Sequence, residues 1–272
     1  MEASNLTKER IKEFLAENKR FDSRELLDFR NIEIETGVSK NAEGSCRVKL
    51  GNTEVVAGVK IGVAEPYTDS EDEGTLVTTV ELLPLSSSRF EMGPPGIEAI
   101  ELARIVDRSV RESGFIDFKK LCIKKEEKVY SIMIDIYSLN DEGNLIDASC
   151  LAAVMALKTA KMPKYDEKKE KIEFGKLTNK PIPLSNKVPL TITFHKVGEK
   201  IIVDPIKEEE DASDARLSIA LTKDKEIMIN ALQKGGEEPL TQEEVEKIID
   251  LATEKFKELQ KVIENKIKNT EE

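Results

Sequence analysis

The stretch that decides the fold is residues 128–161, KVYSIMIDIYSLNDEGNLIDASCLAAVMALKTAK. Its first part, KVYSIMIDIYSL at 128–139, alternates apolar and polar side chains, which predicts a half-buried strand. Its last part, IDASCLAAVMALKTAK at 146–161, is rich in alanine and predicts a largely buried helix. Together they predict the centre of a compact unit of strands and helices.

Further strands and two helices are predicted before this stretch. The predicted strands are IEIET at 32–36, CRVKL at 46–50, TEVVAGVKIGV at 53–63 and TLVTTVEL at 75–82. Gly51 and Asn52 separate the second and third segments, which predicts a hairpin with its turn at that pair. Apolar spacing predicts helices at 5–19, capped by Asn5 or Thr7, and at 97–112, after the breaker GPPG.

The chain after residue 161 repeats this outline. The Lys, Glu and Pro-rich stretch 162–187 is predicted to connect two units. A second hairpin, VPLTITFHKVGEKIIVDP, and two more strands, SDARLSIALT and KEIMINAL, follow it. A long helix is predicted from the Thr241 cap, with Glu244 completing a capping box, to about Lys268.

These blocks predict an α+β fold in two similar halves. The expected organisation is an N-terminal helix at 1–20, a first unit at 21–161, the connecting segment at 162–187, and a second unit with its C-terminal helix at 188–272.

Net charge and hydropathy exclude several classes of function for this chain. The chain has 272 residues, with 42 Lys and Arg against 53 Asp and Glu, for a net charge of −11. A generally basic, RNA-coating protein is excluded, so any nucleic-acid contact must come from a local cluster of Arg or Lys. The N-terminus is polar and no apolar run reaches about 18 residues, which predicts a cytoplasmic protein that does not engage a membrane.

The number and spacing of the cysteines and the single histidine argue against a disulfide framework, a zinc site and a catalytic histidine. Three cysteines, without a CxxC pair, and a single histidine fit neither a disulfide framework nor a zinc site. His195 lies in the alternating stretch LTITFHKV, where a structural role in a strand is favoured over catalysis. A Walker loop and a GxGxxG motif are both missing, so nucleotide binding has no local signature. We expect neither a metal nor a cofactor.

Arg104, Arg108 and Arg111 are spaced four and three residues apart, so they share one stripe of the predicted helix at 97–112. Arginines on an anchored helix suit phosphate binding, because a guanidinium donates bidentate hydrogen bonds. The alternative is that they pair with nearby acids, namely Glu101, Asp107 and Glu112.

A dense acidic run lies in the second half: Asp204, Glu208, Glu209, Glu210, Asp211 and Asp214. Paired carboxylates suit Mg²⁺. Consecutive acids between strands favour instead a solvated turn, which is the prediction made for this run.

Five ordered blocks resemble the RNase PH family over most of the chain: RFDSRELLDFRNIEIETG, GNTEVVAGVKI, ELARIVDRSVRES, VYSIMIDIYSLNDEGNLIDAS and DPIKEEE. Within the family, the patterns FExGPP and DPxxEEE resemble the non-catalytic RNase PH-like ring subunit of the archaeal exosome. The resemblance implies two β-α units packed back to back. It also implies a six-membered ring in which three copies alternate with three copies of a catalytic partner.

Such a ring degrades single-stranded RNA from the 3′ end using phosphate, can also tail it, and carries RNA-binding cap subunits. The resemblance places Arg104 and Arg108 at the interface with the catalytic partner, where they hold the RNA backbone. Arg111 matches a further arginine of the family helix, with a weaker link to RNA. Arg89 is a weaker candidate still, by proximity to the same surface.

Two departures from the catalytic members of the family imply that this chain has no catalytic residues. Catalytic members carry a Gly-Gly-Thr/Ser-Arg loop that holds phosphate, whereas this chain has Ile146 where the arginine is expected. They also carry a Glu-Ala-Asp before the final apolar strand. An ungapped alignment puts Arg216 at the Asp position, and a two-residue shift would put Asp214 there.

The sequence therefore predicts an inactive, structural and RNA-binding subunit of a phosphorolytic exoribonuclease. One alternative is a self-sufficient phosphate-dependent 3′-5′ exoribonuclease that uses Asp214. Another is a spacer protein that does not contact RNA.

Overall fold

The first half of the chain forms one mixed sheet in this computed structural model, which describes residues 4–271 and side chains as far as residue 264. Its strand order is β1 (Ile32–Thr36), β2 (Gly44–Leu50), β3 (Thr53–Ala64), β6 (Lys128–Asn140) and β4 (Thr75–Leu82). The short β5 (Cys122–Lys124) pairs with β6, after the 3-10 turn η1 (Phe118–Leu121). All pairs are antiparallel except β4 with β6. The predicted hairpin is confirmed, because Leu50 pairs with Thr53 across the turn.

Two helices lie between the two halves. These are α2 (Ile97–Arg111), which contacts β4, β11 and β12, and α3 (Leu145–Thr159), which contacts the first sheet and β9. Both begin and end within two residues of the predicted bounds. Gly44 of β2 permits a close approach of α3: a Cβ added at Gly44 would overlap Ala156 of α3 and Ala160, the residue that caps its C-terminus.

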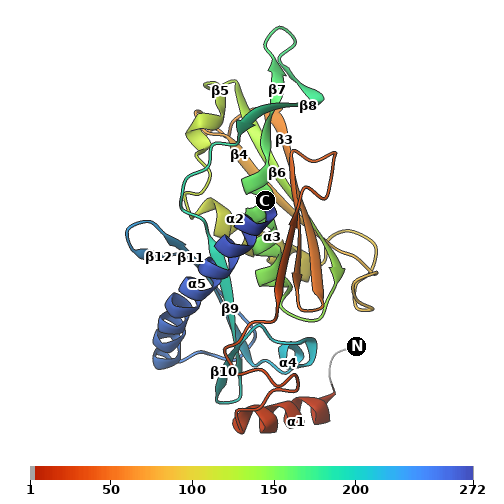
Figure 1. The fold of residues 1–272 in the computed structure, drawn as a ribbon, viewed down its shortest axis with the longest axis vertical. Helices are drawn as coiled ribbons and strands as arrows, with labels where there is room; N and C mark the ends of the chain where they lie inside the picture. Colours follow the sequence, from red (N-terminus) through yellow and green to blue (C-terminus); the bar gives the residue numbers. More distant parts are fainter. Residues whose placement is uncertain (1–3, 272) are drawn as a thin grey trace.

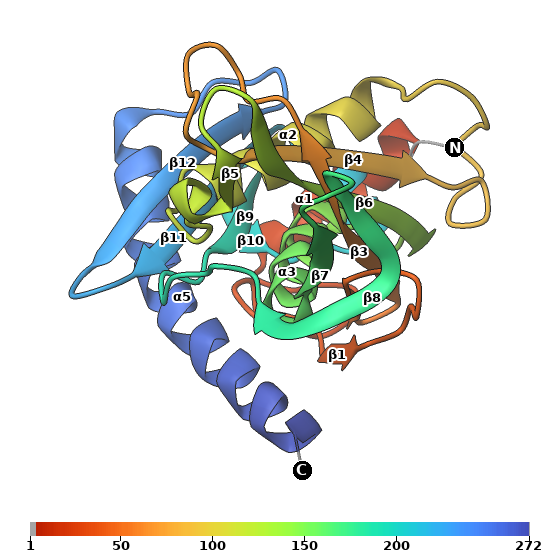
Figure 2. The same ribbon diagram turned by 90° about the horizontal axis from the view of Figure 1, so that it is seen from above.

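The second half forms an antiparallel sheet of order β10 (Lys200–Val203), β9 (Leu190–Val197), β11 (Ala215–Lys223) and β12 (Ile227–Gly235). The long helix α5 (Gln242–Glu271) packs against β9 and β11 and reaches β1 (Figure 2). Its predicted capping box is confirmed: Thr241 N donates to the Glu244 carboxylate at 2.8 Å, and Glu244 N donates to Thr241 Oγ1 at 3.2 Å.

One hydrophobic core runs through both halves. Its buried side chains come from both sheets and from the helices, and include Ile134 of β6, Ile105 of α2, Ile192 of β9 and Phe256 of α5. The strand β9 is buried along nearly its whole length because both α3 and α5 contact it. The predicted α+β fold is therefore correct, and the shared core holds α2 firmly between the two sheets.

The N-terminal helix α1 (Asn5–Ala16) lies at the opposite end of the long axis from the hairpin described next (Figure 1). Its cap is Ser4, whose hydroxyl accepts from Thr7 N, so the predicted caps Asn5 and Thr7 are wrong. Ile11 and Leu15 are buried in a small second core with residues of β9, β10 and Ala212. The helix therefore packs on the second half of the chain.

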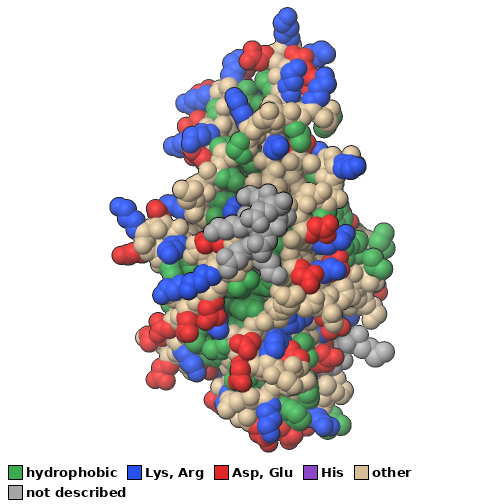
Figure 3. Space-filling model, in the orientation of Figure 1, with side chains coloured by type: hydrophobic (Ala, Val, Ile, Leu, Met, Phe, Trp, Pro, Cys, Tyr) green, Lys and Arg blue, Asp and Glu red, His purple; other side chains and the backbone are tan. Residues whose placement is uncertain are grey.

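The predicted connecting segment 162–187 is largely folded. It contains most of a projecting hairpin made of β7 (Lys161–Asp166) and β8 (Lys171–Pro181), visible at the upper end of Figure 1. Lysines gather over it in Figure 3; the exposed ones include Lys164, Lys168, Lys169, Lys171 and Lys176. The charged composition suggested a linker because a hairpin that stands in solvent has few apolar positions to fill.

The acidic run is not a solvated turn, so that prediction is wrong. It contains the short helix α4 (Lys207–Asp211), and two of its acids, Asp204 and Glu209, are fully buried and paired with arginines from the segment before β1. Glu209 binds Arg20 through two bonds of 3.0 and 2.6 Å. Asp204 accepts from Arg24 at 3.0 Å and Arg30 at 2.7 Å. We call these five residues the buried ion cluster.

The Mg²⁺ alternative for the same acids finds no support in the side chains. Within residues 4–264, no group of three or more His, Cys, Asp or Glu side chains is arranged to hold a metal ion. The carboxylates of Asp204 and Glu209 are instead occupied by guanidinium groups.

Candidate RNA-binding helix and the adjacent cavity

The two leading RNA-binding candidates point away from the core. Helix α2 buries Leu102, Ile105 and Val106, while Arg104 and Arg108 are exposed on its other side. Neither arginine has an ion pair or a side-chain hydrogen bond to any residue of the described part of the chain. Their guanidinium groups are therefore available to phosphates, while the buried face of the same helix keeps their backbone fixed.

Arg111, the third member of the predicted stripe, is occupied. Its guanidinium binds both carboxylate oxygens of Asp107 at 2.8 Å and donates to the carbonyl of Leu76 on β4 at 2.9 Å. The hydrogen bond that Arg111 donates to Asp107 raises the pKa of Arg111. Arg111 thus ties α2 to β4, and its hydrogen bonds would have to break before it could bind RNA.

Arg89, the weakest candidate, is also paired. It lies in the loop between β4 and α2 and donates to Asp141 at 2.9 Å, with Asp211 at 3.7 Å. Its side chain faces a cavity rather than open solvent. The structure therefore leaves two of the four predicted arginines, Arg104 and Arg108, without partners among the described residues.

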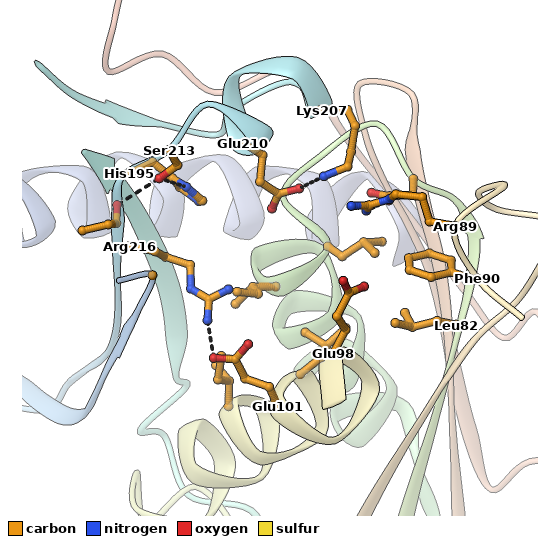
Figure 4. Close-up of a pocket in the computed structure, with 17 residues that line it drawn as sticks. Leu82, Arg89, Phe90, Glu98, Glu101, His195, Lys207, Glu210, Ser213 and Arg216 are labelled. Atoms are coloured by element: carbon orange, nitrogen blue, oxygen red, sulfur yellow. Dashed lines mark hydrogen bonds and ion pairs between the residues drawn. The ribbon is translucent and has the colours of Figure 1, made fainter. Parts of the chain in front are cut away.

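A cavity of about 290 Å³ lies beside α2, between the two halves (Figure 4). Its polar wall includes three cations, each held by a carboxylate. Lys207 binds Glu210 at 2.8 Å, Arg216 binds Glu101 at 2.5 Å, and Arg89 binds Asp141. Each cation is therefore paired with a carboxylate that neutralises its charge, although Nε of Arg89 and Nε of Arg216 have no hydrogen-bond partner of their own in the described part of the chain.

Ile146, at the start of α3, lines this cavity and is 6% exposed. The turn before it is set by Asn144, which adopts a left-handed conformation with φ of 58° and caps α3 by accepting from Asp147 N. The next side chain, Asp147, turns away to Thr193 of β9, and burial raises the pKa of Asp147 to about 7. The helix start therefore presents an apolar side chain to the cavity.

Arg216 and Asp214, the two candidates for the family's acid position, lie in different surroundings in the structure. Arg216 on β11 lines the cavity. Asp214 points elsewhere, accepting from Lys12 of α1 at 2.6 Å and from Gly198 N at 2.7 Å. The cavity thus contains Arg216 rather than a carboxylate at this strand.

His195 also lines the cavity, and its ring is buried in β9 with Nδ1 3.1 Å from Ser213 Oγ. This agrees with the predicted structural role. Burial lowers the pKa of His195 to about 4, so the ring is neutral at pH 7.

Because the folded pKa of His195 lies below the unfolded value of about 6.5, its contribution to the free energy of unfolding is complete above pH 6.5 and is lost as pH falls towards 4. Asp147, with its pKa raised to about 7, acts in the opposite direction, so overall stability is a poor readout. The direct measurement is NMR of the single histidine. We expect its ring resonances to stay unchanged from pH 8 to pH 5.5 and to titrate near 4; a midpoint near 6.5 would contradict a buried ring.

Sequence reasoning missed the pairing of Arg216 with Glu101, which joins two residues 115 positions apart. It also missed Lys207 and Phe90 as cavity residues. No local pattern signals such contacts, because they depend on how the second sheet packs on α2.

Comparisons with known proteins agree with this geometry. The 3′ exoribonuclease family, domain 1, RNase PH, matches residues 28–163, and domain 2 of the same family matches residues 187–255. The chain belongs to the RNase PH family of 3′ exoribonucleases.

Within that family its relatives include proteins named exosome complex component Rrp42. The chain is 45% identical to the one from Methanosarcina acetivorans, over 94% of this chain and 92% of the relative. It is 42% identical to the one from Methanothermobacter thermautotrophicus, over 93% of each. These relatives confirm the resemblance predicted from the sequence.

Solved structures give the same result. The Archaeoglobus fulgidus exosome with RNA bound to the active site contains a chain that matches with a TM-score of 0.85 and 38% identity, covering 95% of this chain and 98% of that one. A chain of an archaeal exosome core matches with a TM-score of 0.80 and 36% identity, over 94% and 97%. In the described residues, none of the helices has the length and apolar character needed to cross a bilayer.

Proposed function

We propose that this chain is the structural, RNA-binding and non-catalytic subunit of an archaeal exosome ring in the cytoplasm. The observation that carries the proposal is that Ile146 and Arg216 line the cavity beside α2. The resemblance to catalytic members of the family puts a phosphate-binding arginine and an acid at these two positions. The free arginines of the same helix supply the RNA-binding part.

The cavity is unsuited to phosphorolysis on chemical grounds. An attacking phosphate needs hydrogen-bond donors and positive charge that are not already neutralised. Here the cations are engaged by carboxylates, and the helix start presents the sec-butyl side chain of Ile146. No carboxylate lies at the β11 position to assist a leaving group, since Asp214 is directed at Lys12.

An exposed apolar surface next to the arginines supports assembly with a partner. Large apolar side chains with at least half of their surface exposed lie on the loop before α2 and on its first turns: Leu85, Met92, Ile97 and Ile100. Apolar surface of this kind marks protein interfaces. We propose that the catalytic RNase PH-like partner covers it, in a ring of three heterodimers that also binds RNA-binding cap subunits.

Arg104 follows Ile100 by one turn of α2, so RNA bound by Arg104 and Arg108 would lie along the proposed subunit boundary. These arginines would hold phosphates of single-stranded RNA and direct its 3′ end to the partner's active site. Because α2 is anchored in the core, binding requires ordering of side chains only.

The test of the proposal compares the purified chain alone with the chain assembled with its catalytic exosome partner. With phosphate, Mg²⁺ and labelled RNA, we expect no shortening by the chain alone and 3′-to-5′ shortening by the complex, whose mass should correspond to an alternating hexamer. The variant Ile146→Arg alone should remain inactive, because the cavity still lacks the acid and the glycine-rich loop.

A phosphate-dependent ladder from the highly purified single chain would overturn the proposal in favour of the self-sufficient exoribonuclease. A stable hexamer of this chain alone, without a free interface for a second protein, would contradict the alternating ring.

A further inference from the structure

Helix α2 carries two acids that lie within reach of Arg104. Glu101 precedes it by three residues and Asp107 follows it by three residues. Side chains at this spacing are neighbours on a helix surface and form ion pairs. Either acid would compete with an RNA phosphate for the guanidinium of Arg104. In this structure both acids are held by other arginines.

Glu101 is held from the opposite half of the molecule. Arg216, on β11, donates through Nη2 to its carboxylate at 2.5 Å (Figure 4). The side chain of Arg216 is 18% exposed, while that of Glu101 is 46% exposed. The less exposed arginine thus reaches out of the second sheet and holds the more exposed glutamate on α2.

The path of Arg216 depends on its neighbour in the sheet. Gly235 on β12 is the cross-strand partner of Arg216, and a Cβ added at Gly235 would overlap the guanidinium. The absence of a side chain at Gly235 therefore lets Arg216 lie across β12 towards α2.

Asp107 is held from within the helix. Arg111 binds both of its carboxylate oxygens, and Arg111 is further fixed by the carbonyl of Leu76. Asp107 and Arg111 are four residues apart on one helix, so their ion pair forms without a contribution from the second sheet. The Glu101 pair differs because it exists only when the two halves are packed together.

We propose that Arg216 is a positioning residue for RNA binding: by holding Glu101, it keeps that carboxylate from neutralising Arg104. This inference rests on the proposed function of Arg104 and Arg108. Without Arg216, the Glu101 carboxylate is free to pair with Arg104, and an RNA phosphate must displace it. Arg216 itself needs no contact with RNA.

The experiment measures RNA affinity in the complex with the catalytic exosome partner, in phosphate-free buffer at low ionic strength, with a short fluorescein-labelled single-stranded RNA. We expect Arg216→Ala to weaken binding by about twofold, the scale of an exposed helix ion pair. Adding Glu101→Gln to Arg216→Ala should restore the parental affinity, since no competing carboxylate remains. Glu101→Gln alone should bind at least as tightly as the parent.

A second variant changes no charge. Gly235→Ala should push the Arg216 guanidinium away from Glu101 and weaken RNA binding as Arg216→Ala does, and Glu101→Gln should rescue it in the same way. The mass of each complex shows whether the variant still assembles, and the midpoint of urea unfolding shows whether it is still stably folded. Any variant that loses RNA affinity only because it fails to assemble or fold is identified in this way.

The competing explanations give different results. If the double variant Glu101→Gln, Arg216→Ala binds as weakly as Arg216→Ala, Arg216 acts by contacting RNA or through packing, and the proposal is overturned. Parental affinity of both Arg216→Ala and Gly235→Ala overturns it as well. The double variant Arg104→Ala, Arg108→Ala is measured alongside to test the proposed function itself. If that variant binds RNA as the parent does, these arginines do not bind RNA, and the inference about Arg216 fails with the proposed function.

Discussion

Glu209→Ala is expected to lower the free energy of unfolding of the chain by about 3–5 kcal/mol, the cost of leaving a buried charge without its partner. The side chains of Arg20 and Glu209 are 0% and 1% exposed, so water cannot replace the lost carboxylate. Arg20 would keep its bonds to the carbonyls of Val203 and Asp204 and a longer contact of 3.9 Å with the Asp22 carboxylate, which offset only part of the loss. Urea unfolding followed by circular dichroism measures the effect.

The matched control is Glu208→Ala, one residue earlier in the same acidic run. Glu208 is exposed and has no ion pair within residues 4–264, so its removal should change stability by less than about 0.5 kcal/mol. Equal losses in the two variants would show that the acids act through α4 as a whole rather than through the buried pair.

The regular elements could be predicted because their signals are local. Period-two alternation identified β6 at 128–139, the Gly51 turn fixed the register of β2 with β3, and the Thr241 capping box fixed the start of α5. In each case the residues that define the element are close in sequence.

The buried ion cluster could not be predicted, because its partners are distant in the chain. Glu209 and Arg20 are 189 residues apart, and a run of acids has the same composition whether it is solvated or buried. The hairpin of β7 and β8 was missed for a related reason: strands that stand in solvent do not require apolar alternation.

In the candidate site, too, local patterns could be predicted and contacts between distant residues could not. The spacing of the α2 arginines predicted a common stripe, but which of them are free depends on the acids around them. Asp107 pairs with Arg111 inside the helix, whereas Glu101 is held by Arg216 from β11, a contact that sequence spacing does not encode. The predicted pairing of the stripe with its own acids therefore holds for Arg111 alone.

Replacing both Arg104 and Arg108 by alanine is expected to weaken RNA binding by the assembled complex by about 30-fold or more. Each charge-assisted phosphate contact contributes roughly 1–2 kcal/mol, so two contacts contribute at least about 2 kcal/mol. Assembly should be unaffected, because the substitutions leave the exposed apolar surface of Leu85, Met92, Ile97 and Ile100 unchanged. Degradation by the partner should slow in parallel, and the double glutamate variant should lose more, through added repulsion.

The salt dependence of binding decides whether this loss is due to phosphate contacts. Removing two contacts to single-stranded RNA should make the slope of log affinity against log salt shallower by about 1.4. Lys223→Ala, Lys225→Ala removes two exposed cations from the turn between β11 and β12 and serves as the matched control for net charge. With a net charge of −11, the average surface repels RNA, so binding has to depend on a few well-placed cations, and the control should leave affinity and slope nearly unchanged. If instead the Arg104, Arg108 variant binds RNA with the parental affinity and slope, the stripe is a helix surface without a role in RNA binding and the chain acts as a spacer in its complex.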